Sequence, residues 1–201
     1  MDEGYVKFRQ EWIAGPPPTG LDELRHWRDT LHACGWIGYD EQLGVSYGNI
    51  SLRGTAGQFI ISGTNTGRPA HCDDASFTRV EAFDIGGNWL ASRGPVPASS
   101  ESLTHAAVYL ARADVGAVIH IHDRALWQRW LDRLPTTGRD LAYGTPEMAL
   151  AVQAACAGLA LPTVIVMGGH TDGLLALGAS VAAAAAALQA CAAGGVSHSV
   201  G

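Results

Sequence analysis

Apolar residues between positions 21 and 31 recur every three to four residues, a spacing typical of one face of a helix. Gly35 follows this run, and glycine commonly ends helices. At the other end, Thr19 with Asp22 three positions later resembles a capping box. The pattern therefore predicts an amphipathic helix from about Leu21 to Gly35. Its inward face would consist of Leu21, Leu24, Trp27 or the aliphatic stem of Arg28, and Leu31.

Short runs rich in β-branched and aromatic residues occupy the next segment, and glycines separate them. Such runs favour strands, and strands that follow one another through short turns pair antiparallel. A glycine-rich turn at residues 86–88 joins the last two runs. The sequence therefore predicts an antiparallel meander, with strands at residues 49–53, 58–62, 80–84 and 89–91.

Helical and strand patterns alternate irregularly in the second half of the chain. The predicted helices cover residues 100–111 and 124–134, a segment capped by Thr145 with Pro146 at its first position, and a last segment that begins at Ser180. The predicted strands cover residues 115–122, 162–167 and 174–177, the last two joined by a turn at 171–173. Trp127 is predicted to pack in the core rather than to serve as a stacking platform.

Length and composition are those of one globular domain. The 201 residues are 47% hydrophobic and 16% charged, which suits a single domain over residues 1–201 with a sizeable core. Residues 1–18 and 194–201 are predicted to be peripheral or frayed, so His198 is not expected to bind a metal.

The charge balance excludes several classes of partner. A net charge of -6 argues against nucleic-acid and anionic-membrane binding, and favours a small-molecule partner. No leader pattern or membrane-spanning apolar stretch is present, so a cytoplasmic location is expected. The cysteines form no CxxC pair and are predicted to be buried free thiols. They are Cys34, Cys72, Cys156 and Cys191.

His120 and His122 stand two positions apart at the end of an apolar, β-branched run. Side chains two residues apart on a strand project from the same face, so two imidazoles at this spacing can bind one metal ion. They could also line a polar groove without a metal.

His170 and Glu101 extend this candidate site. A third imidazole would leave an open coordination position for substrate, as in catalytic zinc sites. The glycines at 168 and 169 permit a close approach of the backbone, or form an ordinary turn. Glu101 falls at the start of a predicted helix, where it could carry a proton or be a solvated acid.

Glycine-centred segments with hydroxyl and amide side chains could bind a phosphate. They comprise Ser46-Tyr47-Gly48-Asn49-Ile50-Ser51, Ser62-Gly63-Thr64-Asn65-Thr66-Gly67, and Ser99 with Ser100. Each segment by itself is equally the ordinary chemistry of turns.

Taken in order, these segments resemble the class II aldolase/adducin family over residues 21–192. The resemblance rests on Gly48-Asn49-Ile50-Ser51, Thr64-Asn65-Thr66-Gly67, Ser99-Ser100-Glu101, His120-Ile121-His122 and His170. It implies that His120, His122 and His170 hold Zn²⁺ or another divalent ion such as Mn²⁺, Co²⁺ or Fe²⁺. It implies that Glu101 is the catalytic acid/base. The implied phosphate-binding residues are Gly48, Asn49, Thr66, Gly67, Ser99 and Ser100.

The same resemblance implies a fold and a reaction. The fold would be a three-layer α/β/α sandwich around a mostly antiparallel sheet, assembled as a homotetramer. The reaction would be retro-aldol cleavage of a small phosphorylated ketose through a metal-stabilised enediolate, giving dihydroxyacetone phosphate and an aldehyde. The alternatives are a dehydratase, decarboxylase or epimerase acting on a related sugar phosphate, or an adducin-like interaction module without chemistry.

The chain departs from the pattern of this family in two places. The stretch between His122 and Gly144 has no evident counterpart of the tyrosine that sugar-phosphate aldolases contribute across the subunit interface, and Tyr143 lies close to the following helix. Asp172 follows the third histidine, where it could hydrogen-bond a metal-binding residue or simply form a turn, with the turn favoured.

Overall fold

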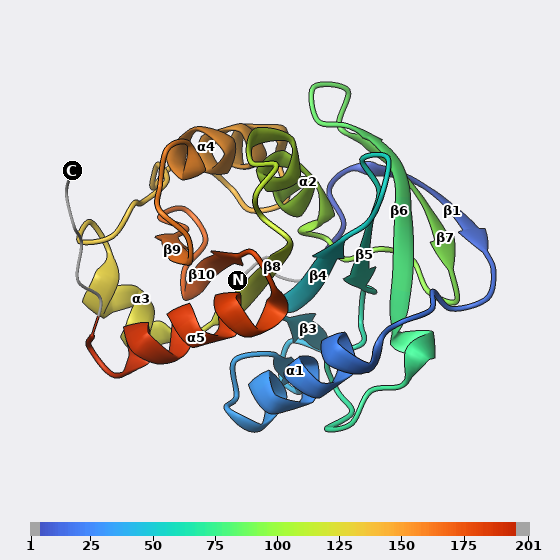
Figure 1. Cartoon of the computed structure of the whole chain (residues 1–201), viewed down its shortest axis with the longest axis horizontal. Helices are drawn as coiled ribbons and strands as arrows, with labels where there is room; N and C mark the ends of the chain where they lie inside the picture. Colours follow the sequence, from blue (N-terminus) through green and yellow to red (C-terminus); the bar gives the residue numbers. More distant parts are fainter. Residues whose placement is uncertain (1–4, 196–201) are drawn as a thin grey trace.

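The computed structural model describes residues 5–195, which form a large sheet covered by helices on both faces (Figure 1). The strands are β1 Arg9–Ala14, β2 Gly38–Asp40, β3 Val45–Tyr47, β4 Asn49–Arg53, β5 Phe59–Ser62, β6 Phe77–Asp84, β7 Trp89–Gly94, β8 Ala117–His122, β9 Thr163–Val166 and β10 Gly173–Gly178. The helices are α1 Asp22–Ala33, α2 Ser102–Ala111, α3 Arg124–Trp130, α4 Pro146–Cys156 and α5 Val181–Ala192, with a 3₁₀ turn at Asp74–Ser76.

The main sheet has eight strands in the order β1-β7-β6-β5-β4-β8-β10-β9, and β2 and β3 form a separate pair. The predicted meander is confirmed, since β4, β5, β6 and β7 pair consecutively and antiparallel. β8 joins the other edge of β4, and β10 lies between β8 and β9. Only β1 runs parallel to its neighbour within the described sheet, so the expectation of a mostly antiparallel sheet is confirmed.

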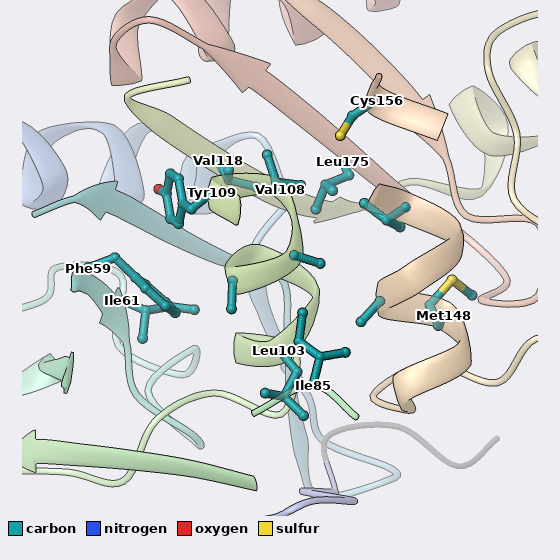
Figure 2. Packing of buried hydrophobic residues seen from close by; sticks show 14 of the residues in the cluster. Phe59, Ile61, Ile85, Leu103, Val108, Tyr109, Val118, Met148, Cys156 and Leu175 are labelled. Carbon is teal, nitrogen blue, oxygen red and sulfur yellow. The ribbon is translucent and has the colours of Figure 1, made fainter. Parts of the chain in front are cut away.

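Two hydrophobic clusters occupy the two faces of this sheet, as strand alternation requires. Val118 and Leu175 point into the cluster covered by α2 and α4, which Figure 2 shows. Ile119 and Leu174 point into the opposite cluster, covered by α1, α3 and α5. The three-layer sandwich is confirmed. His120 has the same parity on β8 as Val118, so it belongs to the α2/α4 face.

Some local predictions are wrong. α1 begins at Asp22, but its N-cap is Leu21 and no side chain caps it, so the capping box at Thr19 does not form. Leu21 is 2% exposed, which indicates that core packing fixes this end of the helix. α3 ends at Trp130 rather than at residue 134, and Asp132 turns the chain with a φ of 61°. The strand β1 was not predicted.

The remaining predictions are confirmed in part. All cysteines are free, as predicted, but only Cys156 and Cys191 are buried, and Cys34 is exposed just after α1. Thr145 and Ser180 cap α4 and α5 as predicted. Within residues 5–195, no helix has the length and apolar character needed to cross a membrane. The predicted tail, with His198, falls largely outside the described residues.

Candidate metal centre

The strand β8 and the turn before β10 bring three histidines together. His120 and His122 project from the same face of β8, as their spacing predicts. His170 comes from the turn that leads into β10, where the backbone amide of Gly173 donates to the His170 carbonyl at 2.9 Å. β10 pairs antiparallel with β8, with Gly173 opposite His122. The pairing of these strands therefore places His170 beside the other two imidazoles.

The Nε2 atoms of the histidines converge on one point. Nε2 of His120 lies 3.2 Å from Nε2 of His170 and 3.1 Å from Nε2 of His122. One nitrogen from each residue lies within 4.8 Å of the others. Nδ1 of His120 lies 3.1 Å from the carbonyl of Leu174, which favours a proton on Nδ1 and a lone pair on Nε2. This arrangement fits a divalent metal ion.

Burial favours the neutral form of these imidazoles, which is the form that binds metals. It lowers the pKa of His120 to about 4. Burial, together with the neighbouring imidazoles, holds the pKa of His122 and of His170 well below the usual value. The donor set is thus ready for a cation near neutral pH, without first having to lose protons.

Gly173 makes room for the histidine rings. A Cβ atom at this position would lie 2.6 Å from Cδ2 of His170 and 3.1 Å from Cε1 of His120. The first distance is shorter than Cβ atoms tolerate, and the second would require the His120 ring to shift slightly. Asp172 lies in the same turn, with a φ of 72°, and its backbone carbonyl accepts a hydrogen bond from the amide of Asp123. Asp172 is a turn residue.

Glu101 lies at the N-cap position of α2 and is 2% exposed. Its Oε2 accepts a hydrogen bond of 2.7 Å from Oγ1 of Thr104, and Oε1 has no partner among the described residues. Burial raises the pKa of Glu101 to about 7, although the hydrogen bond from Thr104 and the charge of Lys7 oppose the shift. A carboxyl group with these properties can exchange a proton near neutral pH.

One cleft contains every residue of the predicted metal, acid/base and phosphate sets. They are His120, His122, His170, Glu101, Gly48, Asn49, Thr66, Gly67, Ser99 and Ser100. The chain brings them from β4, β8, the segment before α2 and three loops. Their spatial grouping agrees with the prediction, and the role of each remains a proposal.

Close backbone packing explains the two glycines of this set. Gly48 has a φ of 71°, and a Cβ atom there would lie 2.8 Å from the carbonyl of Trp36. A Cβ atom at Gly67 would lie 2.0 Å from the carbonyl of Gly38. The amide of Gly67 donates to Oγ of Ser46 at 3.0 Å. Both glycines therefore let the loops approach each other at the floor of the cleft.

Asn49, Ser99 and Ser100 line the same cleft as these glycines. Asn49 is opposite His120 across β4 and β8, and its Oδ1 is buried with no partner among the described residues. Ser99 and Ser100 are buried immediately before α2. A buried polar atom without a protein partner indicates a place where a ligand or water binds.

Tyr143 is closer to the metal-binding residues than its sequence position suggests. Its ring stacks on His170 with 4.7 Å between ring centres, and Nζ of Lys7 lies 3.8 Å above the ring. Tyr47 also lines the cleft, 5.7 Å from the ring of His122. Trp127 instead packs on the opposite face of the sheet, as predicted.

The sequence did not identify Arg28, Lys7 or Gly173 as part of this region. Arg28 lines the cleft, and a charged residue on the apolar face of a predicted helix was a signal that could have identified it. The contact of Lys7 with Tyr143 and that of Gly173 with His120 arise from the packing of distant segments.

Residues 28–128 match the family model described as "Class II Aldolase and Adducin N-terminal domain". The match covers just over half of the chain and includes Glu101, His120 and His122, whereas His170 lies beyond it. A comparison with curated proteins finds no match.

Solved structures share the fold at low sequence identity. An L-fuculose 1-phosphate aldolase superposes with a TM-score of 0.65 at 18% identity, over 88% of this chain and 85% of that chain. YgbL from Klebsiella pneumoniae, described as "a putative aldolase/epimerase/decarboxylase", has a TM-score of 0.63 at 17% identity, over 84% and 82%. A sugar-phosphate aldolase from Thermotoga maritima has a TM-score of 0.59 at 16% identity, over 86% and 94%.

Proposed function

The chain belongs to the class II aldolase and adducin family, and we propose that it is a divalent-metal-dependent lyase that cleaves a small phosphorylated ketose. The observation that carries this proposal is the single cleft, which joins three convergent imidazoles to a buried carboxyl group and to glycine- and serine-rich loops. Two of the structural neighbours are named as aldolases of sugar phosphates. The proposed products are dihydroxyacetone phosphate and an aldehyde.

A divalent ion held by His120, His122 and His170 supplies a Lewis acid that stabilises negative charge on the oxygen atoms of the ketose. Zinc suits three imidazole ligands, and other divalent ions of similar preference are compatible. The carbonyl of Leu174 orients His120, and the ring of Tyr143 stacks on His170. These contacts keep the imidazoles aimed at a common point.

Glu101 is assigned the proton transfer, through Oε1. Retro-aldol cleavage breaks the bond between C3 and C4 of the ketose, removes a proton from the C4 hydroxyl group and adds one to C3. A buried carboxyl group with a pKa of about 7 can take and return such a proton. Thr104 holds Oε2, which leaves Oε1 for the reacting group.

The loops at the other end of the cleft are assigned to the substrate phosphate. Ser99 and Ser100 precede the first turn of α2, where hydroxyl groups, backbone amides and the helix dipole favour an anion. Thr66 and Gly67 belong to the neighbouring loop, where the amide of Thr64 donates to the carbonyl of Pro97 at 3.0 Å, and Asn49 lies opposite His120 on β8. This division of the cleft would hold the phosphate apart from the reacting carbons.

The same groups suit dehydration, decarboxylation or epimerisation of a related sugar phosphate, because each reaction needs charge stabilised on oxygen and a proton moved by one acid/base. The structural neighbour YgbL is described as "a putative aldolase/epimerase/decarboxylase", which makes epimerisation and decarboxylation the second candidates. The homotetramer remains a prediction of the family resemblance, and the cytoplasmic location remains a prediction from the sequence.

Elemental analysis of the purified protein and a cleavage screen test the proposal. The protein is treated with a chelator, restored with zinc, manganese or cobalt, and supplied with a panel of ketose 1-phosphates. We expect metal-dependent release of an aldehyde and dihydroxyacetone phosphate, detected by product mass. A product lighter by one water would instead identify a dehydratase, and a chromatographically distinct isomer of unchanged mass would identify an epimerase. Absence of both bound metal and turnover would favour an interaction module.

Substitution of the proposed acid/base tests its role in that assay. Glu101→Gln should lower turnover by about a hundredfold or more, because the amide cannot transfer the proton. The metal content should stay equal to that of the wild type. Glu147→Gln is the matched control, since Glu147 is an exposed carboxylate at the start of α4. Equal losses in the two variants would contradict the assignment.

A further inference from the structure

Arg28 places a permanent positive charge beneath the loop of residues 64–70. It lies on α1, and only 2% of its surface is exposed. Leu24 and Leu31 on the same face of the helix pack in the core. A buried guanidinium group is costly unless its N–H groups are satisfied, so its partners indicate what it does.

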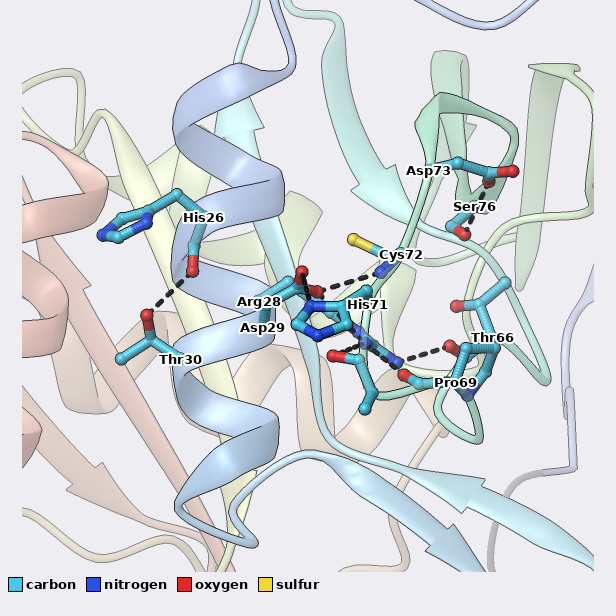
Figure 3. Close-up of polar contacts among 11 residues, drawn as sticks. His26, Arg28, Asp29, Thr30, Thr66, Pro69, His71, Cys72, Asp73 and Ser76 are labelled. Atoms are coloured by element: carbon cyan, nitrogen blue, oxygen red, sulfur yellow. Dashed lines mark hydrogen bonds and ion pairs between the residues drawn. The ribbon is translucent and has the colours of Figure 1, made fainter.

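Those partners are backbone carbonyls of one loop. Nη1 donates to the carbonyls of Pro69 and Ala70, the latter at 3.2 Å, and Nη2 donates to the carbonyl of Thr66 at 2.8 Å (Figure 3). Asp29 accepts a further bond of 3.2 Å from Nη1 and also holds the amide of Cys72 at 2.9 Å. α1 therefore fixes both the middle and the end of this loop.

These bonds set the direction of the peptide between Thr66 and Gly67. In a trans peptide the C=O and the following N–H point in opposite directions. With the Thr66 carbonyl turned toward Arg28, the Gly67 N–H points away from it, and it donates to Oγ of Ser46 at 3.0 Å. Thr66, Gly67 and Ser46 all line the cleft. Arg28 thus binds carbonyl oxygens that would otherwise repel an anion. The same bonds turn the Gly67 amide toward Ser46 in the cleft wall.

Arg28 is also distinctive in charge. Among the described residues that line this cleft, Arg28 is the only lysine or arginine. Arg28 therefore adds a permanent positive charge directly behind the loop. Guanidinium groups keep this charge at any physiological pH.

We infer that Arg28 is a positioning residue for the substrate phosphate, which holds the 64–70 loop with its carbonyls withdrawn and with the Gly67 amide bonded to Ser46 at the cleft wall. The inference rests on the proposed function, because it needs a phosphorylated ligand. It separates two properties of the arginine: the charge, which lysine would keep, and the fork that spans three carbonyls, which lysine cannot reproduce.

The test measures inorganic phosphate binding by calorimetry on zinc-loaded protein at fixed ionic strength. Arg28→Met should weaken phosphate binding by about tenfold or more, with the zinc content unchanged. Arg28→Lys should fold and keep zinc but remain weaker than the wild type by about threefold or more, because the fork is lost. Arg25→Met is the matched control, since Arg25 is on the same helix but pairs with Asp22 and Asp74, and it should bind as the wild type does.

Several outcomes overturn the inference. A folded Arg28→Met or Arg28→Lys variant that binds phosphate as tightly as the wild type would remove the role of the arginine while leaving the phosphate site intact. Wild-type protein that binds zinc but neither phosphate nor a ketose phosphate would overturn the proposed function itself. Hydrogen exchange on the wild type adds a test that needs no variant. Phosphate should protect the amides of residues 64–70, and unchanged exchange there despite phosphate binding would also overturn the inference.

Discussion

The two ends of the cleft are built by different means. At the end with the three histidines proposed to bind metal, here called the metal end, paired strands carry the side chains, because His120 and His122 lie on β8 and the turn to its partner β10 supplies His170. At the loop end, Thr66 and Gly67 belong to a segment outside the main strands, and a helix residue, Arg28, holds that segment. The metal end is rigid by sheet pairing, whereas the loop end depends on a few buried hydrogen bonds.

The ends also differ in electrostatics. Burial keeps the imidazoles neutral, so the metal end offers lone pairs to a cation. The loop end has a buried guanidinium group and amide donors, which suit an anion. Glu101 lies in the same cleft, with a raised pKa. The comparison teaches that one cleft can serve ligands of opposite charge when each end has its own support, and it predicts that the two ends can be damaged separately.

The largest effect should follow loss of a metal-binding residue. His122→Ala should abolish stable metal retention and lower turnover by about a thousandfold, because two imidazoles hold a divalent ion weakly. Phosphate affinity and the far-ultraviolet spectrum should be retained. Metal content and calorimetry measure these properties. His26→Ala, an exposed histidine on α1, is the control, and equal loss of metal in both variants would break the comparison.

A second effect should appear in the pH dependence of stability. Burial raises the pKa of Glu101 from 4.5 to about 7. Below pH 4.5 the carboxyl group is protonated in both the folded and the unfolded chain. Between pH 4.5 and 7 the carboxyl group is ionised in the unfolded chain but still protonated in the folded chain, so by pH 8 the metal-free wild type should have lost roughly 3 kcal/mol of stability relative to Glu101→Gln. Urea unfolding at pH 5 and pH 8 measures this difference. If the free energies of unfolding of the two proteins changed by the same amount between pH 5 and pH 8, the carboxyl group of Glu101 would not be desolvated in the folded protein.

A smaller effect is expected from crowding the histidine rings. Gly173→Ala would place a Cβ atom 2.6 Å from Cδ2 of His170 and should weaken metal binding by about ten- to a hundredfold, as loss of ligand orientation does elsewhere. A competition assay with a fluorescent chelator gives the affinity. At Gly86 the nearest atom to an added Cβ is 3.7 Å away, so Gly86→Ala should bind normally. A normal affinity in the Gly173 variant would mean that the turn yields easily.

The smallest effect should come from the loop end. Ser46→Ala removes the acceptor of the Gly67 amide and should weaken phosphate binding by about fivefold, equivalent to about 1 kcal/mol. The metal content should not change. Calorimetry with phosphate measures the change, and Ser76→Ala, a serine in the 3₁₀ turn whose hydroxyl bonds Asp73, is the control. A loss of metal from the Ser46 variant would show that the two ends are coupled.

Most of the fold could be predicted because its signals are local. The spacing of apolar residues identified α1 and the strands of the meander, and the caps at Thr145 and Ser180 marked two helix starts correctly. Predictions failed where tertiary contacts override local preference. Leu21 occupies the N-cap position of α1 because its side chain packs in the core. β1 forms because it pairs with β7, although most of its side chains are exposed.

The candidate site shows the same division. His120 and His122 could be paired from sequence alone, because a strand repeats every two residues. The approach of Tyr143 to His170 and of Arg28 to Thr66 could not be predicted, since these contacts join segments that are 27 and 38 residues apart and meet only through packing.

The sequence by itself determined the periodic features: most of the helices and strands, the strand face that carries the histidines, and the set of residues typical of a metal and phosphate site. The tertiary structure alone decided the distances that make this set a site. Convergence of the Nε2 atoms depends on the antiparallel pairing of β8 and β10. The raised pKa of Glu101 and the hold of Arg28 on its loop depend on burial. The physical reason is that periodicity is a property of neighbouring residues, whereas desolvation and convergence arise only when distant residues exclude water together.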